Sequence, residues 1–427
     1  MKFHKVNPAG AAYPVCVICG SPILESKYPD YNDREDWGQK TRNRRGRCAY
    51  TSTADVEATD LSDDPARWAK WYRAIIFHPK TKGAHLSGLA RGAHPDYAPV
   101  VPTDSNKARL SGRPKHDNDW NTEFYPADIF YKRALIKDKR YGFAIHAHCW
   151  LLLTRTIDLA TIERNLEVFC LAVRLLWNFE GRAPYWGRTL THNPSNRCLD
   201  QGTFGRRKIK MVGVFCNPDR PAEWPLYARH TSGSPYHIPK IHALITQATQ
   251  SAGKCSNQAR PRRQQRPQPT QPIATRLPLD IALEIIDVIY HSDAPTFARA
   301  KDTRNILEAF HWHLPDSYWI KRCNPGLLFE IADLRASGKP VDWATFCLGI
   351  EELLVDPNWF CNSGLGRRRV VLDFVATLQR YMHWIMFDEE WRGKYLANHS
   401  GEAADWGWCH GLGGGGGGRA RVNVGAD

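Results

Sequence analysis

The sequence predicts an α+β protein, with a mixed α/β domain at the N-terminus followed by a mainly α-helical domain. Three observations lead to this prediction. The segment Trp71–Pro79 is β-branched and aromatic and ends in proline, which is typical of a strand. Several segments after residue 276 carry apolar residues at helical spacing. Between these regions, residues 251–275 are rich in Gln, Pro and Arg and offer almost nothing to bury.

The composition is that of a globular chain long enough for two domains. The chain has 427 residues, of which 42% are hydrophobic and 11% aromatic, and this excludes disorder of the whole chain. No apolar run approaches the roughly 18 residues that a membrane span requires. The N-terminus also lacks the apolar segment of a secretory signal. We therefore expect a cytoplasmic or nuclear protein without a membrane span, whose cysteines stay mostly reduced.

Changes of composition predict five successive parts. We expect an N-terminal α+β domain with long surface loops, a disordered linker, a first helical segment, a further helical region, and a disordered glycine-rich tail. Their boundaries are residues 1–250, 251–275, 276–322, 323–395 and 398–427.

The N-terminal domain carries one clear helical pattern beside the strand at Trp71–Pro79. Apolar residues recur at helical spacing over Asp158–Asn178, and Asp158 is suited to capping the first turn. The C-terminal part has five amphipathic segments that predict helices. These are Leu277–Tyr290, Ala298–Trp312, Asn324–Ser337, Asp342–Val355 and Gly366–Phe387.

The charge is strongly basic, with a formal net charge of +14 that is gathered into islands. Such islands are consistent with contact with nucleic acid or an acidic protein surface, or with a nuclear import signal, but they are more typical of solvated loops. No groove-reading motif accompanies them. The islands are Lys40–Arg47, Lys132–Arg140, Arg206–Lys210, Arg260–Arg266 and Arg367–Arg369.

Two short motifs could form a metal site. Cys16 and Cys19 form a CxxC turn followed by glycine, which lets two thiolates approach one tetrahedral ion. His146 and Cys149 form an HxxC pair of the same spacing within the apolar segment "YGFAIHAHCWLLL". Together they predict a closed Cys₃His site for structural zinc.

Other interpretations of these residues remain open. The thiols and histidines could simply be packed in the core, or Cys149 could be a reactive thiol assisted by histidine. The zinc interpretation requires a turn or a helix start at His146, because an extended chain points His146 and Cys149 to opposite faces. In such a turn His148 points elsewhere. No phosphate-binding loop, dinucleotide fingerprint, nucleophile elbow or kinase motif occurs, so we expect no enzyme.

The segment after the linker resembles an F-box. It opens with "LPLDIALEIIDVIY", continues with a second helix and closes with "LPDSYW", over about a tenth of the chain. The segment "DTRNILEAFHWHLPDSYWIKR", together with the CxxC motif near the N-terminus and "HAHCW", also resembles the sequences of a large group of F-box proteins of filamentous fungi. The residues that match the pattern are Leu277, Pro278, Asp280, Ile281, Ile285, Ile286, Ile289 and Trp319.

This resemblance implies a non-enzymatic adaptor. Its family joins a Skp-type adaptor of a cullin–RING (SCF) ubiquitin ligase to a target protein. The implied partner-binding residues are Leu277, Pro278, Ile281, Ile285, Ile286 and Trp319. The short predicted helix at Leu277–Tyr290 cannot bury all of its apolar side chains within its own segment. The apolar stripe that stays exposed is consistent with binding to a helix of a partner protein. The alternative is a zinc-stabilised interaction or regulatory protein without a ligase, whose basic islands contact nucleic acid, or a single core helix at Leu277–Tyr290.

Overall fold

The computed structural model describes those parts of the chain that form the sheet, most of the helices and the cysteine-rich turn. The described residues are 16–20, 23, 49–57, 67–77, 83–92, 100–111, 119–124, 140–179, 233–258, 277–291, 296–323, 325–356, 359–360 and 363–390. Within them the chain mixes strands and helices, as an α+β protein should. The predicted tail at 398–427 lies outside these residues.

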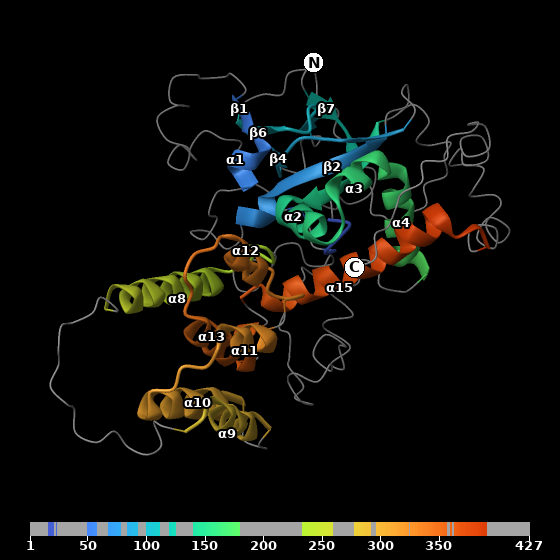
Figure 1. Cartoon of the computed structure of the whole chain (residues 1–427). Coiled ribbons are helices and arrows are strands. Elements are labelled where there is room, and N and C mark those ends of the chain that lie inside the picture. The colour runs from blue at the N-terminus through green and yellow to red at the C-terminus, as the bar shows by residue number, and fades with distance from the viewer. Residues whose placement is uncertain are drawn as a thin grey trace.

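A five-stranded sheet forms the centre of the N-terminal part (Figure 1). The strand β2 (Trp71–Phe77) pairs antiparallel with the whole of β9 (Tyr141–His146), from Tyr72 opposite His146 to Phe77 opposite Tyr141. The strand expected at Trp71–Pro79 is thus present. The other strands of this sheet are β3 (Ala84–Leu86), β4 (Ala90–Arg91) and β8 (Glu123–Phe124).

Smaller elements surround this sheet. Two two-stranded sheets pair β1 with β6 and β5 with β7, and a short helix α1 and a 3-10 turn η2 precede β2. Their bounds are β1 Ala49–Ser52, β6 Lys107–Ser111, β5 Val100–Pro102, β7 Asp119–Asn121, α1 Thr53–Glu57 and η2 Arg67–Lys70.

The predicted helix over Asp158–Asn178 is two helices. Asp158 caps α3 (Leu159–Arg164) by accepting a hydrogen bond from the backbone N–H of Thr161, as expected from the sequence. The backbone then leaves helical geometry at Asn165, with φ −129° and ψ 40°, before α4 (Leu166–Phe179) begins. The apolar spacing continues through this break because both helices bury a face in one core, so periodicity alone did not reveal it.

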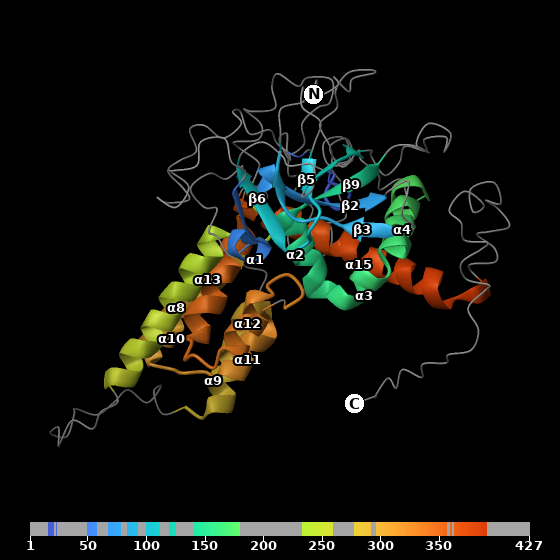
Figure 2. The ribbon, with the colours of Figure 1, turned by 90° about the horizontal axis from the view of Figure 1, so that it is seen from above.

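The remaining helices except α15 form a group to one side of the sheet (Figures 1 and 2). Asp342 caps α13 by accepting from the N–H of Thr345, and α8 packs along α13. The bounds are α8 Pro239–Gln258, α9 Leu279–His291, α10 Thr296–Phe310, α11 Asp316–Arg322, α12 Glu330–Ala336, α13 Trp343–Val355 and α15 Leu365–Phe387.

Buried residues form two hydrophobic cores that do not follow the predicted division at residue 251. The first core joins the sheet to α2 (Ala147–Thr156), α4 and the late helix α15, which packs across α2 and α4. The second core contains α9–α13 and also α8, whose last residues 251–258 fall inside the predicted linker. The polar composition of residues 251–258 predicted a linker, but these residues continue α8. Composition misled here because a helix needs only one apolar stripe to pack on α13.

A buried ion pair lies where the two cores meet. Arg368 at the start of α15 donates to both carboxylate oxygens of Glu330 at 2.8 and 2.9 Å, and is fully buried. It also donates to the carbonyl oxygens of Pro235, Tyr236 and Leu327. The basic island Arg367–Arg369 is therefore neither a solvated loop nor a nucleic-acid surface, because the first two of its arginines are buried in the fold.

Candidate metal centre

The CxxC turn and the end of β9 are held together by backbone hydrogen bonds. The N–H of Val17 donates to the carbonyl of Ala144 at 2.9 Å, which places the turn beside β9. The N–H of Gly20 closes the turn on the carbonyl of Cys16 at 2.8 Å. Gly20 has a φ of 67°, a conformation that glycine adopts without strain. These contacts place the thiols of Cys16 and Cys19 next to the end of β9.

His146 and Cys149 reach the turn because β9 changes into α2 between them. His146 is the last residue of β9, and Cys149 lies in the first turn of α2. The two side chains can point to the same side only in such a junction. The turn that the zinc interpretation required is thus present at the expected place.

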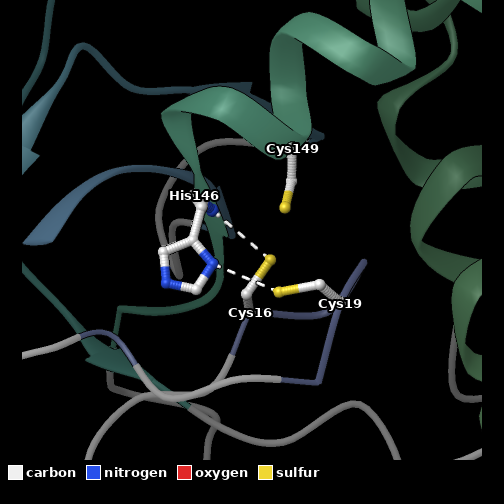
Figure 3. A group of neighbouring side chains, drawn as sticks. All are labelled: Cys16, Cys19, His146 and Cys149. Atoms are coloured by element: carbon white, nitrogen blue, oxygen red, sulfur yellow. Dashed lines mark hydrogen bonds between the residues drawn. The ribbon is translucent and has the colours of Figure 1, made fainter. Parts of the chain in front are cut away.

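Four ligand atoms converge in this position (Figure 3). The Sγ atoms of Cys16, Cys19 and Cys149 and a ring nitrogen of His146 all lie within 4.8 Å of one another. The Sγ of Cys19 is 3.3 Å from Nδ1 of His146, and the Sγ of Cys16 accepts from the backbone N–H of His146 at 3.4 Å. Around a tetrahedral zinc ion, neighbouring sulfur and nitrogen ligands lie about 3.5–3.8 Å apart. The four residues predicted from the sequence are therefore close to the geometry of a metal site.

The site is shielded from water and strongly polarised. All four side chains are fully buried. Burial by itself raises the pKa of the Cys19 thiol, but hydrogen bonds from Cys149 and Cys16 and the charge of His146 outweigh it and hold that pKa well below its usual value. Burial opposes the charged form of His146, yet the thiols of Cys19 and Cys16 raise its pKa to about 10. The site thus favours a Cys19 thiolate next to a positively charged His146 ring.

Cys149 does not have the surroundings of a reactive thiol. Burial, followed by hydrogen bonds with Cys16 and Cys19, raises its pKa well above the usual value. Reactive cysteines are partly exposed and have lowered pKa values. Burial and the raised pKa therefore speak against nucleophilic chemistry at Cys149.

His148 lies outside the cluster, as the sequence indicated. Its Nδ1 is hydrogen-bonded to the hydroxyl of Ser234 at 2.6 Å, and its ring stacks on Trp68 with centroids 6.3 Å apart. Burial, with smaller contributions from His237 and His146, lowers its pKa to about 3, so the ring stays neutral. His148 thus fastens the start of α2 to the segment before α8.

Two residues near the centre were not foreseen. The ring of Trp68, from η2, lies against His146 with centroids 4.8 Å apart. The guanidinium of Arg367, from the start of α15, lies 5.1 Å from the centroid of the Trp68 ring. Nothing local in the sequence points to either, since η2 and α15 meet the site only through the fold.

The residues implied to bind a partner differ in exposure. Leu277, Pro278 and Ile281 are exposed, and Ile285 is half-buried. Ile286 and Trp319 are 0% and 1% exposed and belong to the second core. The last two residues therefore support the helix from inside and do not form its outer surface.

Comparison of the chain with protein-family models, with curated proteins and with solved structures found no match. Among the described residues, no helix is both long and apolar enough to cross a membrane. Of the basic islands, only Arg140 and Arg367–Arg369 fall within the described residues.

Proposed function

We propose that the cluster binds one structural zinc ion. The donor set is the reason, because three thiolates and one imidazole in a closed, buried site are typical of structural zinc. Zinc requires deprotonated thiols, and the lowered pKa of Cys19 favours the thiolate at that ligand. Zinc would tie the N-terminal turn, by Cys16 and Cys19, to the junction of β9 and α2, by His146 and Cys149.

Metal analysis of the purified full chain tests this proposal. We expect about one zinc per chain, as a single four-ligand site requires. The double variant Cys16→Ser, Cys19→Ser should contain none. Cys170→Ser is the matched control, because Cys170 is also a buried thiol but lies outside the cluster. A folded wild-type protein without metal, or with another metal in stoichiometric amount, contradicts the zinc proposal.

For the molecule as a whole, we infer an F-box-like adaptor that docks a partner on α9. The observation behind this inference is an unusual exposure of large apolar side chains. Within the described residues, four of the six exposed large hydrophobic side chains lie between residues 277 and 288. They are Leu277 (37% exposed), Leu279 (46%), Ile281 (46%) and Val288 (67%).

The helix α9 has two apolar faces with different surroundings. Ala282 and Ile286 face the second core and are buried. Ile281 and Val288 are seven residues apart, so they lie on one side of the helix, and both are exposed. Figure 1 shows α9 at the end of the helical group farthest from the sheet. An exposed apolar stripe on a helix is typical of a surface that binds another helix.

The resemblance supplies the partner in this proposal. Three successive helices, α9, α10 and α11, follow the Leu-Pro opening, and Trp319 near the end of the pattern is buried beneath them. The partner is a Skp-type adaptor of an SCF ubiquitin ligase, and other surfaces would recruit the target protein. The chain would then supply proximity, while the ligase supplies the chemistry.

Copurification of the full chain with a Skp-type adaptor tests the function. We expect the wild type to retain the adaptor and the variant Ile281→Asp, Val288→Asp to retain at least tenfold less. Leu159→Asp is the control, because Leu159 in α3 is 41% exposed but far from α9 in the sequence. Equal retention by all three proteins, or retention by none, contradicts the adaptor proposal.

The competing function is a zinc-stabilised interaction or regulatory protein that contacts nucleic acid through basic islands. The only complete island within the described residues is largely buried, which speaks against a role for Arg367 and Arg368 in such contact. The same copurification separates the two functions. Binding to duplex DNA that weakens steeply with salt, together with no adaptor binding, would favour the competing function.

A further inference from the structure

Two cysteines outside the metal centre face each other in the second core. Cys323 caps the end of α11, and Cys347 lies in α13. Their Sγ atoms are 2.6 Å apart, although the residues are 24 positions apart in the chain. Two sulfur atoms in ordinary contact are separated by about 3.6 Å, and a disulfide bond measures about 2.0 Å. The two helices therefore already hold these thiols at a separation close to that of a bond.

The surroundings differ between the two thiols. Cys323 is 8% exposed at the end of a short helix, whereas Cys347 is 1% exposed. The Cys347 thiol donates a hydrogen bond to the carbonyl of Trp319 at 3.2 Å. Cys323 is therefore the more exposed residue of the pair, and the Cys347 sulfur lies in contact with the Cys323 sulfur.

We propose that Cys323 and Cys347 form a peroxide-sensitive thiol pair that oxidises to a disulfide. The Cys323 sulfur attacks one oxygen of hydrogen peroxide, the O–O bond breaks, and Cys323 becomes a sulfenic acid while the other oxygen leaves as water with the thiol proton. The Cys347 sulfur then attacks the Cys323 sulfur, the S–OH bond breaks, and its hydroxide leaves as water with the Cys347 proton. Two thiols and one hydrogen peroxide thus give one disulfide and two waters.

The crosslink would fasten the part of the chain that joins the two cores. The segment between the cysteines contains α12 and Glu330, which holds Arg368. Arg322, next to Cys323, lies 3.4 Å from Asp287 of α9 and 3.6 Å from Glu351 of α13. A disulfide closing this loop restricts the unfolded chain and stabilises the fold. This inference does not depend on the adaptor or zinc proposals.

The experiment starts from the reduced full chain as purified, treated with an equimolar amount of hydrogen peroxide. Digestion without reductant and mass spectrometry should identify one peptide pair linking Cys323 to Cys347, lost after treatment with dithiothreitol. The melting temperature of the oxidised chain should rise by about 5 °C. Cys170→Ser should behave like the wild type, because Cys170 lies in the first core.

A variant checks the order of events. In Cys347→Ser the reaction should stop at a sulfenic acid on Cys323, detectable with dimedone, without any crosslink. The wild-type measurement decides the proposal even if this variant does not fold. A folded wild-type chain in which Cys323 and Cys347 stay unlinked, or become linked only in denaturant, overturns it.

Discussion

The two cores of this protein are organised by different interactions. The first core is tied by polar groups that come from distant parts of the chain, and Cys19 and His146, 127 positions apart, are its clearest example. The second core is mainly an apolar helical packing around residues such as Phe346 and Trp319, yet it leaves the outer face of α9 exposed. The difference indicates that the first core is suited to hold the fold and the second to present a surface.

Removal of the metal should have the largest effect and should separate the two cores. Binding of structural zinc contributes on the order of 10 kcal/mol in small zinc domains, comparable to the whole stability of a typical domain. We therefore expect Cys16→Ser, Cys19→Ser, or strong chelation, to expose the amides of β2 and β9 to hydrogen exchange while α13 stays protected. Cys170→Ser should leave β9 protected. Uniform exchange across both cores would show that they unfold as one unit.

Breaking the ion pair between the cores should have the next largest effect. Arg368→Met leaves the buried carboxylate of Glu330 without its partner, which costs about 3–5 kcal/mol. Adding Glu330→Gln should recover part of this loss, because the buried charge is then removed. Unfolding in urea measures both variants. Strictly additive losses in the double variant would mean that the two residues do not act as a pair.

The two faces of α9 should respond differently to the same kind of substitution. Ile286→Ala removes a fully buried side chain and should cost about 2–5 kcal/mol of stability. Ile281→Ala, on the exposed face, should change stability by less than about 0.5 kcal/mol. Urea unfolding compares them directly. A large loss for Ile281→Ala would place its side chain in a contact within the chain and weaken the docking proposal.

The smallest effect should come from the helix caps. Asp342→Ala removes the acceptor for the N–H of Thr345 at the start of α13 and should cost about 1 kcal/mol. Asp342→Asn keeps an acceptor and should cost less. Asp158→Ala in the short peripheral α3 should lower the melting temperature less than Asp342→Ala, since α13 is central to the second core. The reverse order would mean that α3 matters more to the fold than its packing indicates.

The candidate metal site was largely predictable because its four residues come as two local pairs. The spacing of CxxC and HxxC restricts which side chains can converge, and the need for a turn at His146 followed from strand geometry alone. The neighbours Trp68 and Arg367 were not predictable, because they reach the site from η2 and α15. The F-box resemblance stays a prediction, and the exposed face of α9 is the feature that supports it.

By itself the sequence determined the local features of this protein: the β2 strand, the cap at Asp158, and the four candidate ligands. These depend on residues a few positions apart, so short-range hydrogen bonding and periodicity reveal them. Only the tertiary structure decided that the arginines of α15 are buried, that α8 continues past residue 251 and that α15 belongs to the first core. Burial depends on partners far away in the chain, and no local pattern of charge or spacing contains that information.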